Sequence, residues 1–98
     1  YMRTLSVKQT VYRTAEMMDS LDRQQVGTLA NSSNYLASEV AFDASDAAVQ
    51  TFGGFGIARE YDVERLFRDA RLAKIAPISQ QLSLNYVGEK ALGLPRSF

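Results

Sequence analysis

The sequence predicts an all-α protein, an antiparallel helical bundle of two long and two short helices. Apolar residues recur at the three- and four-residue spacing of helices, and no segment alternates in the way that a strand does. Glycine or proline interrupts the pattern at Gly53-Gly54, at Pro77 and at Gly93 with Pro95, which leaves short connections between the helices. With 98 residues, the chain suits one small domain, and we expect residues 1–98 to form a single partial domain.

The first helix is predicted over residues 3–22. Its mainly apolar stripe follows helical spacing and comprises Leu5, Lys8, Val11, Tyr12, Ala15, Met18 and Leu21. The polar residues 22–25, together with Gly27, then predict a turn. This first segment is expected to be amphipathic, with the stripe directed inward.

A second helix is predicted from Thr28 to Phe52, where Gly53-Gly54 ends it. These residues extend about 37 Å at 1.5 Å per residue. Small side chains dominate the expected inner stripe, which permits a close approach of neighbouring helices; the stripe comprises Leu29, Ser33, Leu36, Val40, Ala44, Ala47 and Ala48.

The third and fourth helices are predicted to be short. Asp62 is the expected N-cap of a helix over 63–74, with Val63, Leu66, Phe67 and Ala70 inward. Pro77 ends that segment, and Ser79 is the expected cap of a helix through Leu82, Tyr86, Val87 and Leu92. Because short helices do not cover a long one completely, apolar surface should remain. Self-association or a missing helix is therefore expected.

Composition excludes several kinds of site. The chain has no cysteine and no histidine, which removes disulfides, zinc sites and histidine-based catalysis, and we expect no metal site. Its formal net charge is zero, so there is no electrostatic case for nucleic acid or an anionic membrane. No apolar run approaches the ~20 residues of a membrane span, and the start lacks a signal-peptide core. We expect a bacterial cytoplasmic or mitochondrial matrix protein without membrane insertion.

The most informative motif is Gln50-Thr51-Phe52-Gly53-Gly54-Phe55-Gly56, which a charged helix follows within ten residues. Glycines expose backbone that a flat anionic ligand can approach, and a helix N-terminus favours negative charge. The alternative interpretation is an ordinary helix C-cap with a surface glutamine. A structural network of ion pairs, common and weak at protein surfaces, is the preferred interpretation of Glu64, Arg65, Arg68, Asp69 and Arg71.

Four segments of the chain resemble the C-terminal helical domain of acyl-CoA dehydrogenases. They are Leu36-Ala37-Ser38-Glu39-Val40-Ala41, the glycine motif above, Glu60-Tyr61-Asp62-Val63-Glu64-Arg65 and Phe67-Arg68-Asp69-Ala70-Arg71. The similarity covers nearly the whole chain in the family's order. The chain looks like the last segment of such a protein, without the family's N-terminal helical domain, middle β domain and first bundle helix.

The resemblance implies a flavoprotein that dehydrogenates an acyl-CoA thioester between its α and β carbons. It implies FAD as cofactor, a homo-oligomer, and an electron acceptor such as a flavoprotein. By the same match, the segment of Gln50, Thr51, Phe52, Gly53 and Gly54 reaches the ADP half of FAD held by a neighbouring subunit. Ser79 and Gln81 match two further FAD contacts, although Ser79 is equally explained as an N-cap.

The sequence departs from the family where the catalytic glutamate usually stands. Pro77 occupies that position, and Ile78 replaces a glycine whose amide polarises the thioester. Proline neither abstracts a proton nor donates a main-chain hydrogen bond, so no catalytic base is assigned to this chain. Some family members carry the glutamate on the earlier bundle helix. A catalytically silent assembly module and a flavin monooxygenase of the same fold stay open as alternatives, and the chain alone is expected to be inactive.

Overall fold

The computed structural model describes residues 1–97; Phe98, the last residue of the predicted domain, lies outside the described residues. The elements are α1 (Met2–Met17), α2 (Arg23–Phe52), the 3-10 turn η1 (Gly53–Gly56), α3 (Val63–Ala73) and α4 (Gln80–Leu92). Residues 1–97 contain no strand. The predicted all-α class is confirmed.

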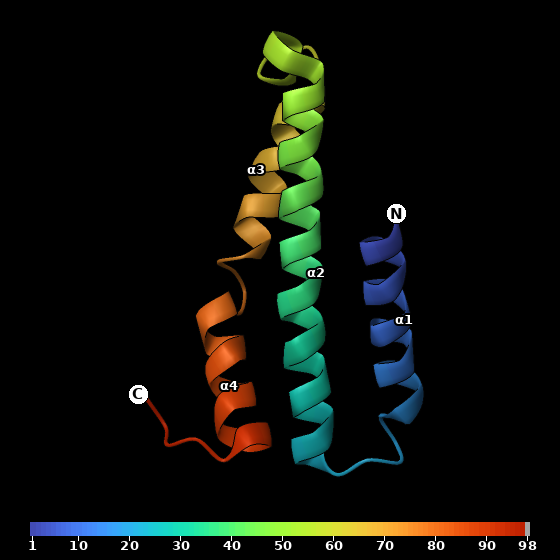
Figure 1. Cartoon of the computed structure of the whole chain (residues 1–98), viewed down its shortest axis with the longest axis vertical. Coiled ribbons are helices and arrows are strands. Elements are labelled where there is room, and N and C mark those ends of the chain that lie inside the picture. Colours follow the sequence, from blue (N-terminus) through green and yellow to red (C-terminus); the bar gives the residue numbers. More distant parts are fainter. Residues whose placement is uncertain (98) are drawn as a thin grey trace.

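The helices lie side by side around α2 (Figure 1). Helix α1 packs along one side of α2, while α3 and α4 follow one another along the other side, and all three run antiparallel to it. The 30 residues of α2 span about 45 Å at 1.5 Å per residue, close to the 47 Å length of the molecule. Among the described helices, α2 alone has neighbours on both flanks.

Helix α2 begins earlier than predicted, at Arg23 rather than Thr28. Asp22 accepts hydrogen bonds from the Gln24 and Gln25 N–H groups, while the Gln25 side chain accepts one from the Asp22 N–H. Because of this capping box, residues 23–25, which were predicted to connect two helices, form the first turn of α2. Helix α1 correspondingly ends at Met17, short of the predicted residue 22.

Gly27, which was expected in the turn, lies inside α2 against α4. A Cβ atom at this position would come within 2.2 Å of the Tyr86 hydroxyl oxygen. Glycine lowers helix propensity, so its place here is explained by packing. The missing side chain lets the Tyr86 ring reach the backbone of α2.

The face that α1 turns toward α2 differs from the predicted apolar stripe. Val7, Thr10, Thr14 and Met17 are half-buried, whereas Leu5, Val11 and Tyr12 of the predicted stripe are exposed. The Thr14 hydroxyl lies 3.5 Å from the Ser33 hydroxyl. Small polar side chains therefore meet at this contact, and the more apolar side of α1 faces away from α2.

Polar and small residues, rather than apolar ones, are buried. Among residues 1–97 no hydrophobic residue is buried, and the most protected positions are Ser33, Ser38, Gly56, Gln80 and Ser83. Leu66, which was predicted to point inward, is 52% exposed, and Leu82 and Leu92 of the predicted fourth helix are 49 and 69% exposed. The accessible surface is 7232 Å², against about 5,600 Å² for a compact monomer of this mass. The predicted uncovered apolar surface is thus present.

The local signals at the helix ends were predicted with mixed success. Gly53 and Gly93 adopt positive φ angles of 58° and 67° and end α2 and α4 as predicted. Ser79 caps α4 by accepting a hydrogen bond from the Leu82 N–H at 3.3 Å. Asp62 occupies the N-cap position of α3 but makes no capping bond, because its carboxylate binds Arg65 instead.

None of the helices formed by residues 1–97 combines the length and the apolar composition that crossing a membrane requires.

Replacing Gly56 by alanine is expected to loosen η1 from the end of α2. A Cβ at Gly56 would lie 2.7 Å from the Val49 carbonyl oxygen and 2.9 Å from its Cα, both backbone atoms. Gly56→Ala should lower the free energy of unfolding by about 1–3 kcal/mol, the usual cost of overpacking. Thermal unfolding followed by circular dichroism measures the change.

Gly54→Ala is the matched control for this substitution. Within the described chain, nothing lies within 4 Å of a Cβ built at Gly54. Its effect should stay within about 0.5 kcal/mol, as for ordinary surface changes. Equal melting temperatures for the two variants would contradict the proposed close contact at Gly56.

Candidate functional site

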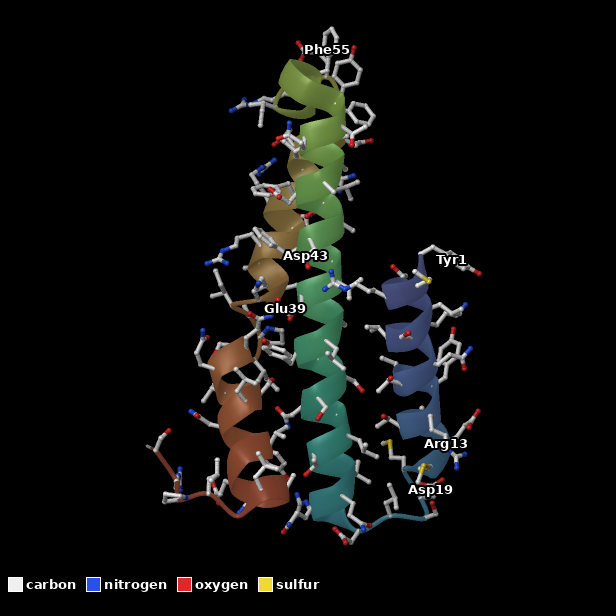
Figure 2. All side chains as sticks on the ribbon, in the orientation of Figure 1. Tyr1, Arg13, Asp19, Glu39, Asp43 and Phe55 are labelled. Atoms are coloured by element: carbon white, nitrogen blue, oxygen red, sulfur yellow. The ribbon has the colours of Figure 1, made fainter. Side chains whose placement is uncertain are left out.

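The predicted nucleotide-binding segment lies at the tip of the molecule, where α2 passes into η1 (Figure 1). Gln50 and Thr51 belong to the last turn of α2 and are exposed, as are Phe52, Gly53 and Gly54. The segment is therefore not packed beneath the other side chains of residues 1–97. Figure 2 shows Phe55 projecting from the same end of the molecule.

The two glycines present bare backbone to solvent. Within the described chain, a Cβ at Gly53 or Gly54 would have no neighbouring atom within 4 Å. The Gly53 N–H donates to the Gln50 carbonyl oxygen, and the Thr51 hydroxyl donates to the Ala47 carbonyl oxygen at 2.7 Å. These bonds fix the end of α2 while its outer surface stays open.

Aromatic side chains lie beside the glycines and form what we call the aromatic tip: Phe52, Phe55 and Tyr61. The Tyr61 ring centroid lies 6.3 Å from that of Phe52 and 5.3 Å from that of Phe55. Phe55 is 63% exposed, so much of its ring is accessible. Phe55 and Tyr61 were not among the predicted site residues, although both stand within or just after the glycine motif.

Bare backbone beside exposed rings has a definite chemical capacity. Aromatic faces can pack against a planar heterocycle, and backbone that lacks Cβ atoms allows a bulky anionic group to approach the main chain. The Gln50 amide adds a side-chain donor and acceptor at the edge of this surface. The Gln50 amide and the open space at Gly53 and Gly54 are compatible with the adenine and diphosphate half of a dinucleotide.

The second group of predicted site residues lies elsewhere, at the start of α4. Ser79 is the N-cap of α4 and Gln81 is exposed. Neighbouring Gln80 bonds to Glu39, and α2 advances about 16 Å from Glu39 to Gln50. The structure therefore does not bring Ser79 and Gln81 together with the glycine motif. Pro77 lies in the connection from α3 to α4, where the preceding and following side chains are Ala76 and Ile78.

A polar cluster joins this connection to the middle of α2. Gln80 donates through Nε2 to the Ser38 hydroxyl at 2.9 Å and to Glu39 Oε1 at 2.7 Å. The Lys74 ammonium forms an ion pair with the same Glu39 oxygen. The hydrogen bonds from Lys74 and from Gln80 lower the pKa of Glu39 below its ordinary value, so the carboxylate is charged at neutral pH. Sequence reasoning missed this cluster, since its members are distant in sequence.

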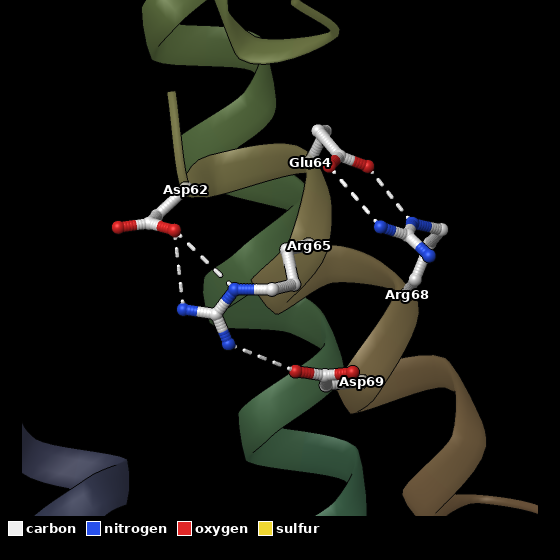
Figure 3. Close-up of polar contacts among 5 residues, drawn as sticks. All are labelled: Asp62, Glu64, Arg65, Arg68 and Asp69. Atoms are coloured by element: carbon white, nitrogen blue, oxygen red, sulfur yellow. Dashed lines mark hydrogen bonds and ion pairs between the residues drawn. The ribbon is translucent and has the colours of Figure 1, made fainter. Parts of the chain in front are cut away.

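Four of the charged residues of α3 form predicted ion pairs (Figure 3): Glu64, Arg65, Arg68 and Asp69. Arg65 bridges Asp62 and Asp69, at 3.2 and 3.3 Å. Arg68 makes two hydrogen bonds to Glu64, and the pKa of Glu64 is lowered mainly by them. These pairs connect residues of one helix and its N-cap, which is consistent with a structural rather than a catalytic role.

Arg71 and Lys74 extend the contacts of α3 to α2. The Arg71 guanidinium lies 5.7 Å and the Lys74 ammonium 4.9 Å from the centroid of the Phe42 ring. The Phe67 ring centroid is 5.3 Å from the same ring. Phe42 therefore anchors the C-terminal half of α3 on α2 through cation–π and aromatic contacts.

Comparison with known proteins supplies the chemical context. Residues 1–92 match the sequence family described as the acyl-CoA dehydrogenase C-terminal domain. An acyl-CoA dehydrogenase of Mycobacterium tuberculosis is 43% identical over 86 residues, which cover 88% of this chain and 22% of that protein. Cyclohexane-1-carbonyl-CoA dehydrogenase of Geobacter metallireducens is 34% identical over 82 residues, 84% of this chain and 21% of that protein.

A third relative is, by name, a subunit of a complex. Subunit CarC of a caffeyl-CoA reductase–Etf complex from Acetobacterium woodii is 36% identical over 70 residues, which cover 71% of this chain and 18% of that protein. The chain spans about a fifth of the length of these curated relatives.

Proposed function

The chain belongs to the acyl-CoA dehydrogenase family, and we propose that the protein containing it is an FAD-dependent dehydrogenase acting between the α and β carbons of an acyl-CoA thioester. Residues 1–98 are part of its C-terminal helical domain in this proposal. The observation that carries it is the exposed glycine backbone beside the aromatic tip at the end of α2. FAD, when bound, supplies the acceptor for the hydride that leaves the β-carbon.

Each predicted site residue has a place in this proposal. The Gln50 amide bonds to the nucleotide, Gly53 and Gly54 let it approach the main chain, and Thr51 and Phe52 complete that surface. Phe55 and Tyr61 add ring surface, because they lie against one another beside the glycines. Ser79 and Gln81 contact the cofactor at the start of α4.

The separation of the two groups supports a site shared between subunits. Gln50 and Gln80 lie at different heights along α2, so the glycine motif and the start of α4 face separate regions. We propose that the tip reaches the ADP half of a neighbouring subunit's FAD, while Ser79 and Gln81 serve the site of their own subunit. Each site is then incomplete without a second copy.

The proton acceptor of this reaction is proposed to lie outside residues 1–98. Pro77, at the family's usual glutamate position, has no group that binds a proton, and no acidic residue occurs between Asp69 and Glu89. A flavoprotein is the proposed electron acceptor, because one relative is by name a subunit of an Etf complex.

Anaerobic mixing of the intact, FAD-loaded protein with a panel of acyl-CoA thioesters tests the dehydrogenase proposal. At least one thioester is expected to bleach the oxidised flavin absorbance, because the proposed reaction transfers a hydride to FAD. If no acyl-CoA bleaches the flavin, the assignment is wrong. Flavin turnover that requires oxygen would then identify a monooxygenase, and failure to bind FAD would identify an assembly module.

Gly54→Val is expected to weaken FAD binding by the intact protein about tenfold or more, a loss of 1.4 kcal/mol or more. The branched side chain would occupy the open space at the glycine backbone. Ala30→Val serves as a control, because it adds bulk at an exposed position near the opposite end of α2. Fluorescence titration with FAD measures both affinities. Equal affinities would remove the glycine motif from the proposed cofactor site.

The uncovered apolar surface supports the proposed homo-oligomer. The outer side of α1 exposes Leu5, Val11 and Tyr12, and an open groove between α2 and α3 is lined largely by Ala41, Ala44, Ala48, Val63, Leu66 and Ala70. Burial of such surface is the main driving force of association. Small residues in the groove allow another helix to approach closely.

Sedimentation velocity of residues 1–98 is therefore expected to show a dimer or a larger assembly. Titration of the same sample with FAD should reveal no tight binding, because most of the cofactor site is proposed to lie in other parts of the protein. A stable monomer at high concentration would contradict the first expectation, and micromolar or better affinity for FAD would contradict the second.

A further inference from the structure

The connection between α3 and α4 is held at both ends by one oxygen atom of α2. Glu39 Oε1 accepts a hydrogen bond from Gln80 Nε2 at 2.7 Å and pairs with the Lys74 ammonium. Lys74 is the C-cap of α3 and Gln80 is the first residue of α4. The carboxylate thus joins the two residues that flank residues 75–79.

Two further contacts hold the connection between those ends. The Gln80 N–H donates to the Lys74 carbonyl oxygen at 3.1 Å, which closes the loop on itself. Asn34 Nδ2 donates to the Ile78 carbonyl oxygen at 3.4 Å and to the Ser83 hydroxyl at 3.1 Å. Asn34 and Glu39 of α2 therefore reach the connection and both of its flanks.

Apolar packing does not hold the connection between α3 and α4 in place. Ile75 and Ile78 are 55 and 47% exposed, whereas Gln80 and Ser83 are 7 and 0% exposed. The connection is thus fixed by buried polar side chains while its apolar side chains face outward. Charge-assisted hydrogen bonds are stronger than neutral ones, which makes the Glu39 carboxylate the principal member of the cluster. Lowering of its pKa by Lys74 and Gln80 keeps it ionised at neutral pH.

We propose that Glu39 is a positioning residue for residues 75–79: by holding Lys74 and Gln80 together, it fixes the place of Pro77 and Ser79 relative to the flavin site. The part of this inference that concerns catalysis rests on the proposed function. Its structural part, that the Glu39 carboxylate orders the connection, stands on the contacts alone.

The test compares Glu39→Ala and Glu39→Gln in the intact protein with the control Asp43→Asn. Asp43 lies one turn further along α2 and is also ion-paired, but its partner is Arg3 of α1 at 2.7 Å (Figure 2). Substitution of either acid therefore removes one ion pair made by α2. Only the Glu39 variants lose contact with the connection between α3 and α4.

Amide hydrogen exchange is the first measurement. Glu39→Ala should raise the exchange rate of the hydrogen-bonded amides of residues 75, 76 and 80 about tenfold or more, the scale expected from losing a bond to a charged group. Glu39→Gln should give a smaller increase, since its amide oxygen still accepts from Gln80 but lacks the charge that attracts Lys74. Asp43→Asn should leave these amides unchanged. Faster exchange confined to this connection distinguishes positioning from general destabilisation, which raises exchange along all helices.

The rate of flavin reduction by an acyl-CoA that reduces the wild-type protein is the second measurement. Glu39→Ala should slow reduction about tenfold, equivalent to 1.4 kcal/mol, at unchanged FAD content, and Asp43→Asn should not. Exchanging the charges in the double variant Glu39→Lys with Lys74→Glu restores an ion pair. Its exchange rates should return toward those of the wild type, relative to Glu39→Lys alone.

The outcomes separate this inference from the proposed function. If the connection exchanges equally in the wild type and in the Glu39 variants, the inference is overturned, whatever the flavin does. If the wild type is not reduced by any acyl-CoA, the proposed function fails while the exchange comparison still decides the role of Glu39. If Glu39→Ala speeds amide exchange in the connection but leaves the rate of flavin reduction unchanged, the catalytic part of the inference is overturned.

Discussion

The architecture depends on the close packing of every other element against α2. Helices α1, α3 and α4 and the turn η1 all contact this single helix, and the most deeply buried side chains of its contact surface are the small, polar Ser33 and Ser38. Gly27 and Gly56 allow the closest approaches, one to the Tyr86 ring and one within the α2–η1 corner. Because α2 connects the tip to the connection between α3 and α4, its straight 30-residue course also sets the separation of the two candidate cofactor surfaces.

The buried side chains of residues 1–97 are polar, whereas many large apolar residues are exposed, the reverse of an autonomous small domain. Ser38, Gln80 and Ser83 are buried with hydrogen-bond partners, while Leu66, Leu82 and Leu92 remain exposed. Hydrogen bonds contribute modest net stability but are directional, so these contacts fix how the helices lie on α2. The exposed apolar side chains can contribute hydrophobic stabilisation only when another copy or domain covers them. This accords with the proposed assembly of several copies and domains.

Local chemistry could be predicted from the sequence, whereas the packed faces could not. The helix ends at Gly53 and Ser79 follow from backbone conformation and capping, both of which are local properties. The start of α2 was predicted wrongly, because Asp22 and Gln25 resemble a turn unless they are recognised as a capping box. The stripe through Leu5 and Val11 was assigned to the wrong contact, since apolar periodicity indicates which face is buried but not by which partner. The predicted site segment is exposed at the tip, but its cofactor role remains a prediction.

In the proposed alignment, Pro77 takes the place of the family's usual glutamate, and the connection between α3 and α4 then has a different task. A flexible catalytic side chain can adjust its own position over a bound substrate, but Pro77 and its apolar neighbours have no such freedom. Whatever these residues contribute must therefore come from the position of the backbone and of Ser79. That position is set from α2, where Glu39 and Asn34 contact the connection and its flanks. Under the proposed alignment, a chain without a base at this point thus keeps a reason to hold the connection rigidly, and the partly buried polar cluster provides the means.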